Sequence, residues 1–313
     1  MVLDNPYLLK MPSKFLRPLV YAMRLVGRKL GMYHGNIKKE VAKNTYCANT
    51  YHFVNTNIHE YYINGLKDIP KDRFDAIVVG SDQIWRSYFF HLYFGEMPDA
   101  FLRFTNGWNI KRIAYAPSFG VEKWEYSEAE TEECKKYITQ MDAVSCRQIE
   151  GVNMCKEYLD YDTVKHVLDP TMLLTKADYQ KFVTVSKEKT GKLLVYVMDA
   201  NNDKQSLVDT IAKERSLTPA SIYQAGVASP PSVEFWLQQF EDAECVVTDS
   251  FHACVFSIIF GKEFIVYANK NRGLSRFTSL LKMFGLEDRL VFNADEYKNI
   301  KINSSISEAQ KKL

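Results

Sequence analysis

The sequence predicts an α/β protein made of two halves, each built on a parallel sheet. Short apolar runs rich in β-branched residues, such as 75–80 and 245–247, are typical of parallel strands buried on both faces. Such runs alternate with helical segments at a spacing of roughly 30 residues, the pattern of a doubly wound sheet. Polar residues or glycine follow several runs, as expected where strands end at a ligand-binding edge.

The first half is predicted over residues 1–170. Its strands are expected at 75–80, 111–116, 142–146 and 164–168. Ser127 with Glu130 three residues later matches a capping box, which predicts a helix over 127–141. A second helix is expected after Arg147.

The second half is predicted over residues 171–313. Its strands are expected at 192–198, 220–223, 245–247 and 264–267, and its helices at 203–215, 231–241, 253–260 and 274–284. Thr248, Asp249 and Ser250 offer capping side chains before the helix of 253–260, and Gly261 is expected to end it.

The composition excludes several classes of protein. The net charge is +2, from 40 basic and 38 acidic residues, so nothing at the level of the whole chain predicts binding to nucleic acid. The six cysteines form no C-x-x-C pair, which favours reduced thiols over disulfides or a zinc site. With neither a signal peptide nor 18 consecutive apolar residues, we expect a cytoplasmic protein.

The segment 15–30, FLRPLVYAMRLVGRKL, is apolar with basic residues interleaved. One interpretation is a basic amphipathic helix that lies on an anionic membrane surface, which would make the protein peripheral at the inner membrane face. Pro18 and Gly27 weaken that interpretation, and the other is a helix packed on its own domain.

Polar residues follow four predicted strands. They are Gly80, Ser81 and Asp82 after the first, Ser118 after the second, Arg147 after the third, and Asp249, Ser250, Phe251 and His252 after the strand of 245–247. In open α/β sheets ligands bind at the carboxyl ends of strands, so these residues are expected to line a cleft between the halves. The alternative is an ordinary set of turns with local hydrogen bonds.

Arg147 and His252 are the residues with the clearest chemistry. Arginine suits bidentate recognition of a carboxylate or phosphate, although a surface ion pair with Glu150 is an alternative. Histidine on the first turn of a helix suits acid–base chemistry, although capping or packing is more common there. Arg272 and Arg276 add positive charge; the alternative is a solvated face.

Five motifs resemble the polysaccharide pyruvyl transferase family. They lie in order within 75–290, and the first and last together are specific: V-V-G-S-D-Q-I-W (78–85), R-I-A-Y-A-P-S-F-G (112–120), V-S-C-R (144–147), V-L-D-P-T (167–171) and V-T-D-S-F-H-A (247–253). Many family members have glycine where this chain has Ala253. Members usually also begin with a strand and loop that would precede Met1, so we expect the first half to lack its N-terminal strand or strands.

The resemblance implies a GT-B-like fold of two Rossmann-like halves. It also implies transfer of the enolpyruvyl group of phosphoenolpyruvate to paired sugar hydroxyls, which gives a pyruvate ketal and phosphate without a cofactor or metal. Arg147 and His252 would be catalytic, and the donor would contact Arg147 and the turn of Asp249, Ser250, Phe251 and His252. The acceptor-side candidates are Gly80, Ser81, Asp82, Ser118 and Arg276.

We expect the acceptor to be a precursor of a capsule, exopolysaccharide or other surface glycan, such as a lipid-linked oligosaccharide at the cytoplasmic face of the membrane. Two alternatives remain open. One is a nucleotide-sugar glycosyltransferase of the same architecture, and the other is a non-catalytic glycan-binding or assembly protein.

Overall fold

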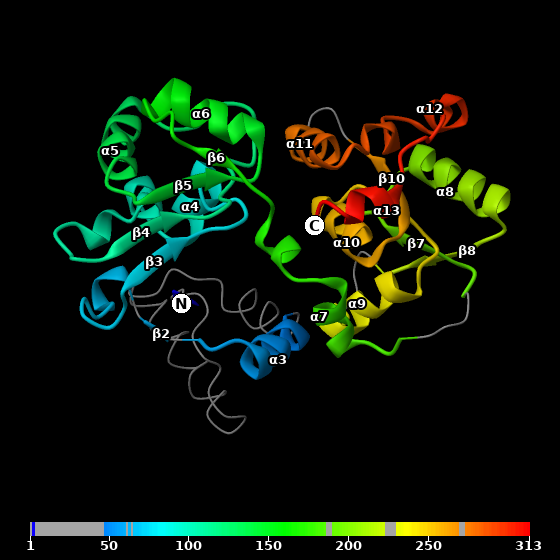
Figure 1. Cartoon of the computed structure of the whole chain (residues 1–313), viewed down its shortest axis with the longest axis horizontal. Helices are drawn as coiled ribbons and strands as arrows, with labels where there is room; N and C mark the ends of the chain where they lie inside the picture. The colour runs from blue at the N-terminus through cyan, green and yellow to red at the C-terminus, as the bar shows by residue number, and fades with distance from the viewer. Residues whose placement is uncertain are drawn as a thin grey trace, which may run out of the picture. The chain divides into compact units, whose positions relative to one another are not determined.

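The computed structural model describes residues 2–3, 47–60, 62–63, 65–185, 190–222, 230–268 and 273–313 (Figure 1). The basic segment 15–30 and Arg272 lie outside these residues, so their predicted roles stay predictions. The chain divides into two compact units, Met1–Pro70 with Gln224–Val233, and Lys71–Tyr223 with Glu234–Leu313.

The smaller unit contains a short parallel pair of strands. Strand β1 (Val2–Leu3) pairs with β2 (Tyr62–Ile63), and α3 (Ala48–Asn57) precedes β2. Asn49 Nδ2 donates a hydrogen bond to the Pro230 carbonyl at 2.7 Å, which joins the two stretches of chain that form this unit.

The larger unit contains two parallel sheets, as predicted. The first has the order β3-β4-β5-β6. Its strands are β3 (Ala76–Val79), β4 (Lys111–Ala114), β5 (Ala143–Cys146) and β6 (Lys165–His166), and its helices are α4 (Ser87–Tyr93), α5 (Glu128–Ile138) and α6 (Ile149–Leu159). Ser127 and Glu130 form the expected capping box at the start of α5. The prediction that the first strand is buried is wrong, because Val78 is 57% exposed and β3 lies at the edge of the sheet that the described residues form.

The second sheet has the order β11-β10-β9-β7-β8 and is also parallel throughout. Its strands are β7 (Lys192–Tyr196), β8 (Thr218–Ser221), β9 (Cys245–Thr248), β10 (Glu263–Tyr267) and β11 (Leu290–Val291). Its helices are α8 (Asn202–Arg215), α9 (Val233–Asp242), α10 (Phe251–Phe260), α11 (Ser275–Phe284), α12 (Ala294–Asn299) and α13 (Ile306–Gln310). The segment Pro170–Phe182, with the short helix α7 (Lys176–Tyr179), connects the two sheets.

Strand β9 is the central strand of the second sheet, and helix α10 follows it in the chain. Every residue of β9 is buried, and so is every residue of α10 except His252. Gly261 ends the helix with φ +70°, in the left-handed conformation that glycine adopts without cost. This packing fixes the turn between β9 and α10 and leaves His252 as the one side chain of α10 that reaches toward solvent.

A buried ion pair holds the same turn on its other side. Asp249 accepts hydrogen bonds from the Lys204 ammonium at 2.7 Å and from the amides of Met198 and Asp199 at 2.7 and 3.0 Å. Lys204 is only 4% exposed, so the interaction is shielded from water. The β9–α10 turn is therefore tied to the loop between β7 and α8.

A glycine fixes the loop after β3. Gly80 has φ +129°, and a Cβ atom at this position would lie 2.0 Å from the carbonyl oxygen of Tyr115. Only glycine fits so close to the neighbouring backbone. The Ser118 amide then donates to the Asp82 carbonyl at 2.7 Å, so the loops after β3 and β4 run side by side.

We predict that Gly80→Ala destabilises the fold by at least about 2 kcal/mol, because the Cβ clash adds to the strain of a positive φ. Gly107→Ala is the matched control, since φ is +76° there and nothing lies within 4 Å of the added Cβ. Urea unfolding of both variants measures the difference. Equal losses would contradict the close approach at Gly80.

We also predict that Lys204→Met costs about 3–5 kcal/mol of unfolding free energy, because it leaves the Asp249 carboxylate buried without its cation. The control is Lys135→Met. Lys135 pairs with Glu132 and Asp160 at the surface, and its loss should change stability far less. Similar midpoints of urea unfolding for the two variants would show that the Asp249 pair does not hold the turn.

Candidate active site

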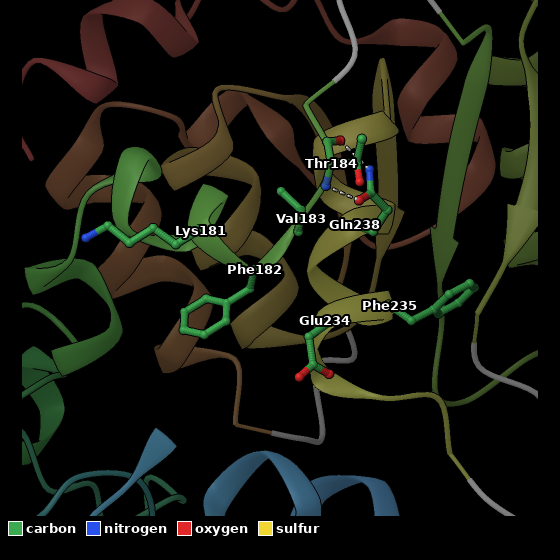
Figure 2. A pocket seen from close by; sticks show the side chains of 7 residues that line it. All are labelled: Lys181, Phe182, Val183, Thr184, Glu234, Phe235 and Gln238. Atoms are coloured by element: carbon green, nitrogen blue, oxygen red, sulfur yellow. Dashed lines mark hydrogen bonds between the residues drawn. The ribbon is translucent and has the colours of Figure 1, made fainter. Parts of the chain in front are cut away.

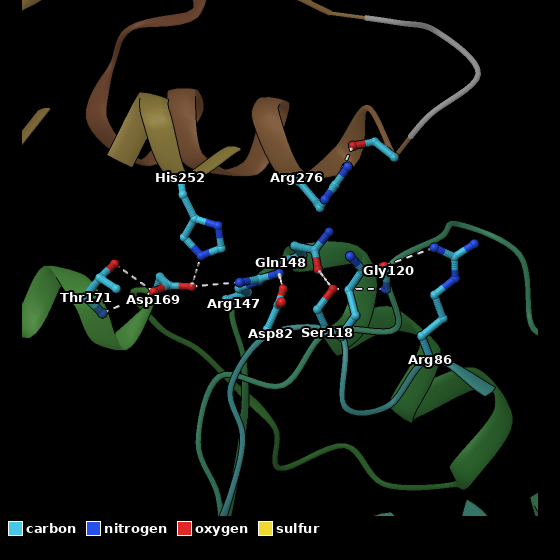
Figure 3. A network of polar contacts seen from close by, with 12 residues as sticks. Asp82, Arg86, Ser118, Gly120, Arg147, Gln148, Asp169, Thr171, His252 and Arg276 are labelled. Atoms are coloured by element: carbon cyan, nitrogen blue, oxygen red, sulfur yellow. Dashed lines mark hydrogen bonds and ion pairs between the residues drawn. The ribbon is translucent and has the colours of Figure 1, made fainter. Parts of the chain in front are cut away.

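Arg147 lies at the centre of a polar network (Figure 3). It follows β5 directly, and its side chain is 1% exposed. Nη1 donates to Asp169 Oδ2 at 2.7 Å, and Nη2 donates to Asp82 Oδ1 at 2.5 Å. The alternative of a surface pair with Glu150 is wrong, because Glu150 instead accepts a hydrogen bond from Ser279 at 3.0 Å.

Asp169 is a site residue that the sequence analysis missed. Its Oδ1 accepts from the Thr171 amide at 3.1 Å and from the Thr171 hydroxyl at 2.8 Å, while its Oδ2 pairs with Arg147. Burial by itself would raise the pKa of Asp169, but the charge of Arg147 and these hydrogen bonds lower it below the ordinary value. The carboxylate is therefore ionised and fixed. The available signal was its place in V-L-D-P-T, directly after a predicted strand.

His252 comes from the second sheet and reaches the same carboxylate. Its Nε2 lies 3.9 Å from Asp169 Oδ2, too far for a hydrogen bond but close enough for the carboxylate to affect the pKa of the imidazole. Desolvation lowers the pKa of His252; Asp169 opposes this shift and the charge of Arg147 reinforces it. The imidazole is therefore neutral at pH 7. Because its side chain is 42% exposed, it can exchange protons with a ligand in the site.

The four residues of the β9–α10 turn divide into two pairs. Phe251 and His252 lie at Arg147, and the guanidinium carbon lies 4.7 Å from the centroid of the Phe251 ring. Asp249 and Ser250 hold the turn itself. The predicted capping by the Ser250 side chain is wrong, because that side chain makes no cap hydrogen bond and the Thr248 hydroxyl accepts from the Ser250 amide at 2.9 Å.

Of the acceptor-side candidates, Asp82 contacts Arg147 directly, while Gly80 shapes the loop that carries Ser81 and Asp82. Ser118 is fully buried, where its hydroxyl donates to Gln148 and accepts from the Gly120 amide. It therefore fastens a loop rather than facing a ligand.

Arg276, on α11, points toward the same network as His252 (Figure 3), and its charge contributes to the lowered pKa of His252. Its Nε lies 3.4 Å from the Gly273 carbonyl, at the limit of a hydrogen bond. Around it, Gln148 approaches Ser275 at 3.5 Å, and the Ile149 amide donates to Ser279 at 3.1 Å. Helix α11 thus joins the second sheet to the start of α6.

A separate depression lies between the short helix η5 (Gln180–Phe182) and α9 (Figure 2). It is lined by Lys181, Phe182, Val183, Thr184, Glu234, Phe235 and Gln238. Gln238 bonds both the amide and the carbonyl of Thr184, at 2.7 and 2.9 Å. None of the residues around Arg147 lines this depression.

Across the part of the chain that the structure describes, no group of three or more His, Cys, Asp or Glu residues is arranged to hold a metal ion. In the same residues, no helix combines the length and the apolar character needed to cross a membrane.

The chain is similar to solved structures and to a protein family. A crystal structure of a functionally uncharacterised protein from Klebsiella pneumoniae subsp. pneumoniae NTUH-K2044 is 16% identical, with a TM-score of 0.42, over 76% of this chain and 83% of that one. That likeness is too weak to bear on fold or function. No curated protein matches the chain.

A family model described as polysaccharide pyruvyl transferase matches residues 27–271. The match covers well over half of the 313 residues and includes every residue of the Arg147 network from Asp82 to His252. The chain therefore belongs to the polysaccharide pyruvyl transferase family and is a transferase.

Proposed function

We propose that this transferase moves the enolpyruvyl group of phosphoenolpyruvate to a pair of hydroxyls on a sugar of a cell-surface polysaccharide precursor, forming a pyruvate ketal. Family membership supports pyruvyl transfer and a polysaccharide acceptor. The single observation that carries the finer proposal is the meeting of a neutral, partly exposed His252 with the buried Arg147–Asp169 pair.

In this proposal His252 carries two protons in succession. It takes the proton of the first hydroxyl and delivers it to C3 of the donor, and the hydroxyl oxygen bonds to the electrophilic C2 that results. The second hydroxyl then attacks C2 while the C2–O bond to phosphate breaks, and His252 passes that proton to the departing phosphate. Each hydroxyl loses one proton, C3 and phosphate each gain one, and His252 ends neutral, as it began.

The donor carries a carboxylate and a phosphate, which require positive charge and N–H donors. We propose that Arg147 binds one of these groups and that the first turn of α10, with the Phe251 amide, lies beside it. Arg276 adds positive charge at the same place. Asp169 holds Arg147 in position through their ion pair, and from 3.9 Å its charge opposes the lowering of the pKa of His252, so it acts through these two residues.

We further propose that the two sheets are the Rossmann-like halves of a GT-B-like fold, divided near residue 170. Asp169 then lies at the junction of the halves, where a residue of either half can reach it. The acceptor would be a lipid-linked oligosaccharide or other glycan at the cytoplasmic face of the membrane, which would place the enzyme in the cytoplasm with peripheral membrane contact.

We predict that the acid limb of the profile of kcat/KM against pH has its midpoint below the ordinary histidine value of about 6.5. The midpoint lies below this value because burial lowers the pKa of His252. The neutral form of His252 must accept a hydroxyl proton, and protonation at low pH removes that form. His252→Gln should lower kcat about 10²- to 10⁴-fold and remove this limb. An unchanged acid limb in that variant would assign the titration to another group.

We predict that phosphoenolpyruvate binds to the purified chain and that Arg147→Lys weakens this binding about tenfold or more, because lysine keeps the charge but loses the planar fork. His252→Gln is the matched control, and it should keep the donor affinity within about threefold, as proton transfer does not contribute to binding. Titration calorimetry measures both variants. Preferential binding of a nucleotide sugar would favour a glycosyltransferase instead.

A further inference from the structure

The two carboxylates that bind Arg147 are held very differently. The side chain of Asp169 is 1% exposed and is fixed by Thr171 as well as by Arg147. The side chain of Asp82 is 61% exposed, and among the described residues its carboxylate bonds only to Arg147 Nη2. Asp169 is thus a permanent partner of the guanidinium, whereas Asp82 can leave at little cost to the fold.

One edge of the Arg147 guanidinium is only partly hydrogen-bonded. Nε and Nη2 lie on the same edge of the planar fork, the edge that binds a carboxylate or phosphate through two parallel hydrogen bonds. Asp82 engages Nη2 on this edge, while Nε is buried and has no hydrogen-bond partner among the residues that the structure describes. A buried N–H without a partner is costly, so this edge favours a ligand that bonds both nitrogens.

Removal of Asp82 requires only a rotation of its side chain. Its backbone carbonyl is held by the Ser118 amide at 2.7 Å, and Gly80 fixes the start of the loop against Tyr115. Asp82 itself has φ +52°, a conformation that aspartate, asparagine and glycine tolerate better than other residues. The loop can therefore stay in place while the exposed carboxylate moves.

Charge also favours the replacement of Asp82 by an anionic ligand. With Asp82 in place, Arg147 and the two carboxylates carry a net charge of −1, which repels an anionic ligand. When Asp82 leaves, the remaining Arg147–Asp169 pair is neutral. The positive charge of Arg276 nearby then attracts the anionic ligand without repulsion from the Asp82 carboxylate.

We propose that Asp82 is a resident anion that occupies the Nε–Nη2 edge of Arg147 and is displaced by an anionic group of the donor. This inference rests on the proposed function for the identity of the donor, but the exchange itself depends only on anion chemistry. Asp82 thereby keeps the site closed to weakly binding anions and sets the affinity of the donor.

The test compares anion binding by the wild type with Asp82→Asn and Asp82→Gly. Asparagine keeps the shape of the side chain and removes its charge, and glycine removes the side chain while suiting the positive φ. Asp160→Asn is the control for net charge. Asp160 is an exposed carboxylate paired with Lys135 after the far end of α6. Calorimetric titration with phosphoenolpyruvate and, separately, with inorganic phosphate measures the affinities, and thermal unfolding checks each variant's fold.

We expect both Asp82 variants to bind phosphoenolpyruvate about three- to tenfold more tightly than the wild type, as expected for removal of a partly exposed competing ion pair, with the glycine variant tightest. Asp160→Asn should match the wild type. Donor affinity that is unchanged or weaker in both folded Asp82 variants would overturn the exchange while leaving the donor assignment intact.

Tighter binding of phosphate but no binding of phosphoenolpyruvate would support the exchange and overturn the proposed donor. If neither anion binds to any of the folded proteins at millimolar concentration, both proposals are overturned.

Discussion

The ion pair between Arg147 and Asp169 is the interaction on which the rest of the site depends. Both side chains are almost completely buried, so neither charge can be stabilised by water. The structure compensates with the Thr171 hydrogen bonds on Asp169 and with Asp82 and the Phe251 ring on Arg147. Removing Arg147 would leave Asp169 as a buried charge without its cation, and removing Asp169 would leave the buried Arg147 with only the exposed carboxylate of Asp82. The Asp169 carboxylate also lies 3.9 Å from the imidazole of His252, which α10 positions.

Much of the fold could be predicted from the sequence because its signals are local. The runs 193–196 and 245–247 are apolar and short, and the structure forms the parallel strands β7 and β9 there. Strand β11 and helices α12 and α13 were not predicted. They are short, and β11 is a two-residue strand whose formation depends on pairing with β10 rather than on its own sequence.

The site was harder to predict because its contacts come from strand order and not from sequence spacing. The sequence predicted that Arg147 and His252 face one cleft, but it did not indicate the carboxylates that pair with Arg147, and the alternative of a pair with Glu150 is wrong. Glu150 is three residues away, yet Arg147 lies outside α6, which begins at Ile149, so helical spacing does not apply to the pair. The actual partner lies 22 residues on, because β5 pairs in parallel with β6 and brings the two strand ends together. Asp249 was expected at the donor, but its carboxylate is used by Lys204, a contact from α8 that no local pattern indicates.

The aromatic ring of Phe251 covers one face of the Arg147 guanidinium, and the carboxylates of Asp82 and Asp169 pair with its nitrogens. Dissolved ions screen charges that water can reach, and they act much less on charges enclosed by protein. A site built from exposed lysines would lose its attraction for a negatively charged metabolite as ionic strength rises. Arg147 is enclosed by protein, so the attraction between Arg147 and an anion in the proposed donor site would depend little on ionic strength.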